Sequence, residues 1–415
     1  MSAAAPAPGN GRAADSPRHL ALLALSVLLP VPWLLLWLSG GDELDPLLVA
    51  LCSGFSILGA AFLLSWGVEL AERDIPQSLA LMILALVAVL PEYAVDISYA
   101  VIAARNPEYA QYTIANMTGA NRLLIGLGWA AVVLLACRRA GGRELAIARH
   151  HQLEMRFLLL ATFYSFLIPL GGLGLVDAAV LLLIFFGYAK QAARGHREEA
   201  PLVGPAAWID ARTSTRGRRL SILVILLYAT GAILLAAEPF AHGLVEVGKD
   251  YGVDEFILVQ WVAPLASESP EFLVALLFAW RLRGSVGIGA LISSKVNQWT
   301  LLVGALPIAY CIAFWLLQVK NGAPMRWGLE LEPRQVWELW LTSAQSLFAL
   351  VVICDFRFAR WEALALALLF ATQLVFPEVR HTFTMLYLLL SFLVLAFSPE
   401  RRRAFLDLLP RLRRP

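Results

Sequence analysis

Two Pro-Glu pairs lie inside apolar segments of this 415-residue chain, at Pro91-Glu92 and at Pro270-Glu271. A proline within a helix removes one amide donor and frees a backbone carbonyl one turn earlier. Carbonyl and carboxylate oxygens are the ligands that hard cations prefer. Each pair therefore combines the two kinds of oxygen that could bind a cation.

Further polar residues surround or follow each pair, although polar side chains are costly in hydrocarbon and usually mark ion or substrate pathways. In the first half they are Asp96, Asn116, Asn121 and Arg122, and in the second half Ser267, Glu268, Lys295, Asn297 and Gln298. Asp96 lies one helical turn after Glu92, and Glu268 lies one turn before Glu271. Each half thus has a Pro-Glu helix followed by a helix with small and amide residues.

The composition requires that these residues lie in a membrane protein. Hydrophobic residues make up 59% of the chain and charged residues 15%, whereas a soluble domain is about 25% charged. These values exclude a soluble enzyme, a DNA-binding module and a disordered scaffold. Twelve apolar segments follow an Ala- and Pro-rich tail, at about 19–39, 46–70, 77–103, 109–137, 154–170, 172–189, 220–238, 254–280, 285–316, 338–355, 361–376 and 383–397.

The distribution of lysine and arginine predicts the orientation of these segments. With the N-terminus in the cytoplasm, 25 of the 33 basic residues fall on the inner side and six on the outer side. The remaining two, Arg122 and Lys295, lie within spans. We therefore expect both termini to be cytoplasmic, and segment 19–39 to be an uncleaved helix rather than a signal peptide.

In this orientation the two polar hairpins are inverted relative to each other. The loop after the first Pro-Glu helix is outside and the loop after the second is inside. Inverted repeats with helices interrupted by proline place substrate sites near the bilayer midplane.

The doubled, inverted Pro-Glu hairpins resemble the alpha repeats of the cation/calcium exchanger superfamily, the sodium/calcium exchanger membrane region. The family repeat reads roughly G-T-S-L-P-E, followed by G-N-x-x-G-S-N-x-x-N, and the resemblance covers 77–137 and 254–316 most closely. It implies an all-α polytopic fold of about 12 transmembrane helices. Its core would be ten helices in two inverted five-helix repeats, with one extra helix at each end.

The resemblance also implies a metal site. Glu92 and Glu271 match the family's central ion ligands, and Ser267 matches a hydroxyl ligand of the second repeat. The corresponding hydroxyl positions of the first repeat are Ala88 and Val89, so those ligands are missing. The other candidate ligands are Asn116, Asn121, Asn297 and Gln298 at amide positions, and Asp96 and Glu268 where the family has serine.

Arg122 and Lys295 have no expected counterpart in the family. We interpret them as built-in cations whose partners are the four acids Glu92, Asp96, Glu268 and Glu271, or as bridges between helices. Fully ionised, these six residues carry a net charge of −2, which suits one divalent or two monovalent cations.

These features predict a secondary antiporter that moves Ca2+ or a related cation against Na+ or H+ by alternating access. A monovalent cation/proton antiporter on the same fold and a cation channel are the alternatives. We expect no enzymatic activity, no cofactor other than the transported cation, and no nucleic-acid partner. No phosphate-binding G-x-x-x-x-G-K-[ST] loop occurs, so ATP is not expected to drive transport. The oligomeric state is open.

The expected organisation has five parts. They are a disordered cytoplasmic tail (1–18), a first membrane half (19–189), a cytoplasmic linker (190–219), a second membrane half (220–397) and a basic cytoplasmic tail (398–415).

Overall fold

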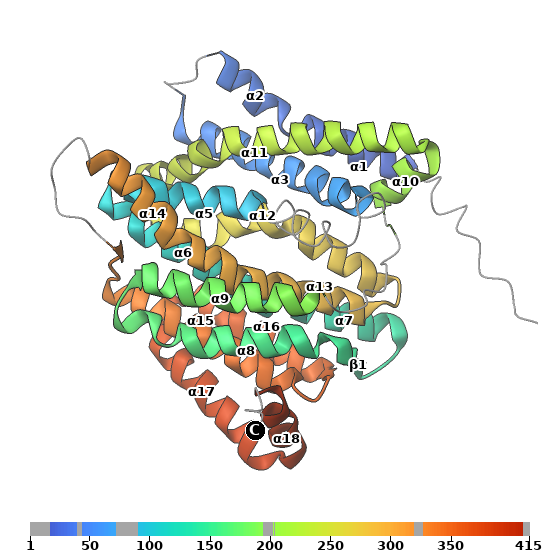
Figure 1. Ribbon diagram of the computed structural model, residues 1–415, viewed down its shortest axis with the longest axis vertical. Helices are drawn as coiled ribbons and strands as arrows, with labels where there is room; N and C mark the ends of the chain where they lie inside the picture. Colours follow the sequence, from blue (N-terminus) through green and yellow to red (C-terminus); the bar gives the residue numbers. More distant parts are fainter. Residues whose placement is uncertain are drawn as a thin grey trace, which may run out of the picture.

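The computed structural model describes residues 17–39, 44–71, 90–193, 202, 204–318 and 327–409, and these residues are almost entirely helical (Figure 1). The helices of the first half are α1 (Pro17–Leu28), α2 (Val31–Leu38), α3 (Pro46–Ala71), α5 (Leu90–Ala103), α6 (Ala110–Leu123), α7 (Ala130–Ala140), α8 (Gln152–Ser165) and α9 (Leu175–Ala192). Those that follow are α10 (Gly204–Arg212), α11 (Thr215–Tyr251), α12 (Glu255–Trp280), α13 (Gly284–Asn297), α14 (Val303–Gln318), α15 (Pro333–Ile353), α16 (Arg360–Val375), α17 (Arg380–Phe397) and α18 (Pro399–Leu408).

The all-α polytopic membrane fold is confirmed. Within the described residues, nine helical stretches are long and apolar enough to cross a bilayer, or ten if the two arms of α12 count as one span. The expected number of twelve is not confirmed. Residues 77–89 of the third expected span lie outside the described residues, and α16 has only 16 residues.

Two expected boundaries differ from the structure. The seventh span was expected to end at Glu238, but α11 runs for 37 residues and ends at Tyr251, with Pro239 inside it. The expected apolar segment ends there, yet α11 continues beyond it and packs along α3. Helix α10 and the first turns of α11 also lie within the stretch expected to be a linker.

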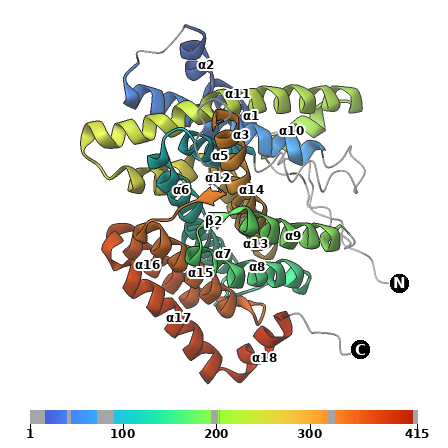
Figure 2. The same ribbon diagram turned by 60° about the vertical axis from the view of Figure 1, so that its left-hand side comes forward.

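The helices are arranged in layers. Helices α3 and α11 lie side by side at one end of the molecule, and α15 to α18 lie at the other end (Figures 1 and 2). Between them, α5 packs against α6 and α14, and α12 packs against α6 and α13. The two Pro-Glu helices, α5 and α12, are therefore both in contact with helices of the opposite repeat.

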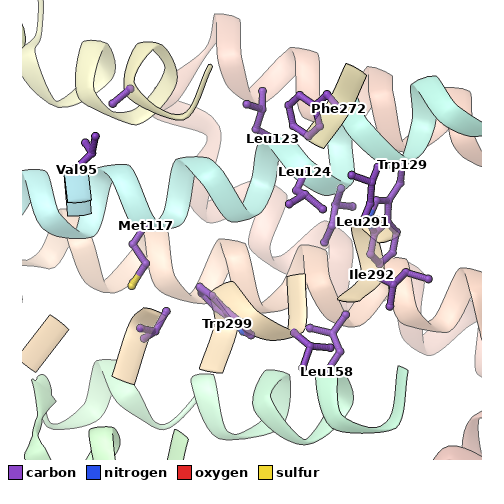
Figure 3. Close-up of a cluster of buried hydrophobic side chains, with 14 of the residues drawn as sticks. Val95, Met117, Leu123, Leu124, Trp129, Leu158, Phe272, Leu291, Ile292 and Trp299 are labelled. Carbon is purple, nitrogen blue, oxygen red and sulfur yellow. The ribbon is translucent and has the colours of Figure 1, made fainter. Parts of the chain in front are cut away.

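Both repeats contain a π-helical segment at a matching place. The segment η2 (Leu124–Trp129) follows α6, and η5 (Gln298–Leu302) follows α13. A π-helical turn widens the helix and is often found at functional sites. Around these turns the packing is apolar, with Trp129 and Trp299 fully buried among leucine, isoleucine and phenylalanine side chains (Figure 3).

Helix α12 is bent and is approached closely by α6. Its two arms, Glu255–Ser269 and Glu271–Trp280, form an angle of 57° at the Pro-Glu pair. At Gly119 of α6, a Cβ would overlap the backbone oxygen of Gln260. Only glycine allows this approach without a backbone shift, so the two helices that carry candidate site residues are in direct backbone contact.

Two pairs of short strands connect the halves. Strand β1 (Glu144–Ala146), before α8, pairs antiparallel with β4 (Arg357–Ala359), after α15. Strand β2 (Leu173–Gly174), after α8, pairs with β3 (Gly328–Leu329), before α15. In each pair the two strands belong to loops that the charge count assigns to the same side of the membrane.

The expected topology can be measured with two single cysteines in a background that lacks the four native ones. Glu108 and Arg283 are exposed, in the loops after the first and the second Pro-Glu helix. We expect Glu108→Cys to react with an impermeant maleimide from outside, and Arg283→Cys to react only after permeabilisation. Labelling of both cysteines from the same side would contradict the inverted arrangement.

Candidate ion-binding site

The four candidate acids come from two helices that are in contact. Glu92 and Asp96 lie on α5, and Glu268 and Glu271 lie on α12. Glu92, Asp96 and Glu268 are at most 3% exposed, and Glu271 is half-buried. Glu92 interacts electrostatically with the other three carboxyls, most strongly with Glu268. The fold thus brings acids of both repeats into one negatively charged group.

Amide side chains hold two of these acids in place. Gln298, the first residue of η5, donates a hydrogen bond of 3.1 Å to Oε2 of Glu92, which joins the two repeats. Asn116 on α6 donates a hydrogen bond of 2.8 Å to Oδ1 of Asp96. Both amides were predicted as candidate ligands, and the structure places each one against a candidate acid.

Several oxygens of this group have no hydrogen-bond partner among the described residues. They are Oε1 of Glu92, Oδ2 of Asp96, both carboxyl oxygens of Glu268, Oε2 of Glu271, Oδ1 of Asn116 and Oε1 of Gln298. Gln298 and Ser294 nevertheless lie close enough to interact with the carboxyls of Glu268 and Glu271, respectively. A buried acceptor without a partner costs about 1–3 kcal/mol. Such a concentration of unpaired oxygens suits a cation, bound protons or water.

The acids alone do not form a complete metal site. In the described part of the chain, no three His, Cys, Asp or Glu side chains are arranged so that they could hold a metal ion. A cation here would need amide, hydroxyl or backbone oxygens as well, as Ca2+ commonly does.

Three other predicted ligands already have protein partners. Ser267 donates to the backbone oxygen of Ala263 in its own helix, at 3.2 Å. Oδ1 of Asn297 accepts a hydrogen bond of 3.4 Å from the hydroxyl of Tyr93. Oδ1 of Asn121 accepts a hydrogen bond from Lys295. Ala88 and Val89, the missing hydroxyl positions of the first repeat, lie outside the described residues.

Lys295 is fully buried between the repeats. Its Nζ donates to the backbone oxygen and to Oδ1 of Asn121, at 2.8 and 2.9 Å. It also lies 5.0 Å from the ring centroid of Trp299. The acids with which it interacts electrostatically are Glu268 and, more weakly, Glu92.

The partner expected for Arg122 was wrong. Arg122 is 2% exposed, and its Nη2 lies 2.6 Å from Oε2 of Glu338 on α15, which is not one of the four acids. Glu338 was missed because it begins an apolar segment and resembled an interfacial flank. The sequence did contain a signal for this ion pair. An arginine without a counterpart in the family, Arg122, lies in one span, and a glutamate, Glu338, lies in another.

Glu338 is the centre of a second buried polar cluster. Gln260 of α12 donates to it at 3.1 Å, and Arg380 at the start of α17 lies 3.5 Å from its Oε1. The guanidinium of Arg122 also lies 5.1 Å from the ring centroid of Trp261. A cavity of about 10 Å³ adjoins this cluster, about enough for one water molecule.

A sequence comparison decides the family. The model of the family described as "Sodium/calcium exchanger protein" matches residues 45–190 and 221–377, which is well over half of the chain. The chain belongs to the sodium/calcium exchanger family. Like the other members it is a membrane transporter and not an enzyme.

Solved structures agree with this family. The exchanger is 42% identical to the crystallised H+/Ca2+ exchanger CAX, over 94% of this chain and 98% of that one, with a TM-score of 0.85. Its fold is also similar to that of YfkE (14% identity, TM-score 0.59, 86% and 98% covered) and of the sodium-calcium exchanger NCX_Mj (17%, 0.51, 84% and 99%).

Among curated proteins, the exchanger is 22% identical to the putative antiporter CaxA of Alkalimonas amylolytica over 106 residues. This match spans 25% of the exchanger and about a third (33%) of the length of CaxA.

Proposed function

We propose that the protein is a secondary antiporter that exchanges Ca2+, or a closely related cation, for H+ across the membrane. The observation that carries this proposal is the group of carboxyls on α5 and α12, several of whose oxygens are buried without a hydrogen-bond partner among the described residues. The similarity to an H+/Ca2+ exchanger along 94% of the chain supports the same substrate pair.

Two acids favour protons over sodium as the counter-ion. Asp96 and Glu268 stand where the resembling motif has serine, so two neutral hydroxyl ligands are replaced by groups that can take up a proton. A buried carboxyl without a cation is tolerated mainly in its protonated, neutral form. Release of a divalent cation is then accompanied by protonation of the carboxyls, and deprotonation must precede the next binding event.

Competition between Ca2+ and H+ for the same site couples the transport of one ion to the transport of the other. Because Ca2+ and H+ bind to the same oxygens, a carboxyl that carries a proton cannot coordinate the cation. Exchange then requires that the site open to one side at a time, which the inverted repeats allow. Glu92 and Glu271 would hold the cation, with Glu268 and Asp96 beside them and Gln298 and Asn116 orienting two of the acids.

Flux in proteoliposomes tests this proposal. With an acidic lumen and Ca2+ outside, we expect rapid Ca2+ uptake that collapses when a protonophore is added together with valinomycin and K+. A Na+ gradient of the same size at equal pH should give no uptake above that of protein-free liposomes.

Other outcomes identify the alternatives. Uptake driven by the Na+ gradient would assign sodium coupling instead. Proton-coupled movement of Na+ or K+ without Ca2+ would indicate a monovalent cation/proton antiporter. Ca2+ conduction without any counter-gradient would indicate a channel.

A further inference from the structure

Lys295 and Asn121 occupy equivalent places in the two repeats. Asn121 lies three residues before the start of η2 at Leu124, and Lys295 lies three residues before the start of η5 at Gln298. Residues at equivalent places near the axis of an inverted repeat meet each other. These two do so, because the lysine donates both of its hydrogen bonds to the asparagine.

The contact has the chemistry of a bound monovalent cation. The lysine Nζ is surrounded by a backbone carbonyl oxygen, a side-chain amide oxygen and the face of the Trp299 ring. Two hard oxygens at 2.8 and 2.9 Å and a π-face attract a positive charge. With an amide in place of Lys295, the two repeats would offer two equivalent amides facing each other across this position.

The charge has a defined set of neighbours. Lys295 interacts electrostatically with Glu268 most strongly, then with Arg122 and Glu92. Arg122 is paired with Glu338, so among the described residues Lys295 is the base that interacts with Glu268 and Glu92 of the acid group. The lysine therefore supplies one charge to a site that otherwise carries four carboxyls.

We propose that Lys295 is a tethered cation that permanently fills a monovalent-cation position between the two repeats, and thereby makes the exchanger independent of Na+. This inference rests on the proposed function for its physiological meaning, because it explains why protons and not sodium ions accompany Ca2+. A covalently attached charge cannot leave during the cycle, so this position contributes no ion to the transport stoichiometry.

The decisive variant is Lys295→Gln, which replaces the ammonium by an amide. We expect Na+ to enter the vacated position, so that Ca2+ flux of the variant rises at least about fivefold when NaCl replaces choline chloride, a factor at the lower end of coupling between two bound ligands. Wild-type flux should be equal in the two salts. Lys295→Arg, which keeps the charge, should behave as the wild type.

A matched control for Lys295→Gln removes the charge of the other buried base, Arg122, together with that of its partner Glu338. The double variant Arg122→Gln/Glu338→Gln deletes the ion pair one residue away from Asn121, and we expect no Na+ dependence from it. Equal flux of Lys295→Gln in both salts, with no Na+ effect on its stability, would show that Lys295 is only a structural bridge and would overturn the proposal.

Thermal stability in detergent separates this inference from the proposed function. Na+ should raise the melting temperature of Lys295→Gln but not that of the wild type, because only the variant can bind it. This holds even if the wild type transports no Ca2+, in which case the proposed function fails and the Na+ position stands. If Lys295→Gln is not monodisperse, the test uses the melting temperature of the wild type with and without Na+. Specific stabilisation of the wild type by Na+, with Lys295 in place, would overturn the inference.

Discussion

Replacement of Glu92 by glutamine is expected to abolish exchange while the protein still folds. Glutamine has the same shape, and its side-chain oxygen can still accept the hydrogen bond that Gln298 donates at 3.1 Å. It cannot, however, carry a negative charge or exchange a proton. We expect Ca2+ flux to fall at least about 100-fold, which corresponds to the loss of about 3 kcal/mol of binding.

Glu271→Gln is expected to behave in the same way, because Glu271 is the corresponding Pro-Glu residue of the second repeat. Glu246→Gln is the matched control, since Glu246 lies on α11 in an exposed pair with Lys249 at 3.0 Å. Its flux should equal that of the wild type. Wild-type flux from Glu92→Gln, at wild-type expression and monodispersity, would remove Glu92 from the site.

The largest effect on stability is expected at Glu338. Glu338→Gln removes the charge that neutralises Arg122, a buried base at 2.6 Å, and also the charge near Arg380. Breaking a buried ion pair by removing one partner costs about 3–5 kcal/mol, because the other charge stays buried and unpaired. We expect the melting temperature in detergent to fall clearly below that of the wild type.

The companion variant removes both charges. Arg122→Met/Glu338→Leu leaves no unpaired charge in this pair and fills the space with apolar groups, so it should recover much of the stability. A Glu338→Gln protein as stable as the wild type would show that the ion pair is unimportant, or that Arg122 is neutralised elsewhere.

Much of the fold follows from the hydropathy pattern of the sequence. The long apolar segments predicted the spans from α6 to α7, α12 and α13 to α14 within a few residues, because a membrane span is set by bilayer thickness and side-chain hydropathy. The extension of α11 to Tyr251 could not be predicted in this way. Its second part lies beyond the expected apolar segment and packs on α3.

The candidate site also has a part that the sequence predicts and a part that depends on how the helices pack. The four acids were predicted because an acid in hydrocarbon is conspicuous in any sequence. The partner of Arg122 was not, since the sequence does not state which faces of α6 and α15 meet. With Arg122 paired to Glu338, the four acids and Lys295 sum to −3 instead of −2. One bound divalent cation would then leave a net charge of −1. Protonation of one of the four carboxyls would bring the net charge of the site to zero.

The two strand pairs have a mechanical consequence. Helix α8 is flanked by β1 and β2, and α15 is flanked by β4 and β3, so strand hydrogen bonds connect these two antiparallel helices at both of their ends. A side-chain contact adds to this connection, since the hydroxyl of Ser165 at the end of α8 lies 2.6 Å from that of Ser343 in the middle of α15. A pair of helices connected at both ends resists shear.

In the described ranges, no strand pair connects the long helices α3 and α11 to the rest of the molecule. They contact it through helix packing. Packed helices can slide over each other by small steps, whereas strand hydrogen bonds must break first. We therefore expect α3 and α11 to shift more readily against the rest of the exchanger than α8 and α15 shift against each other.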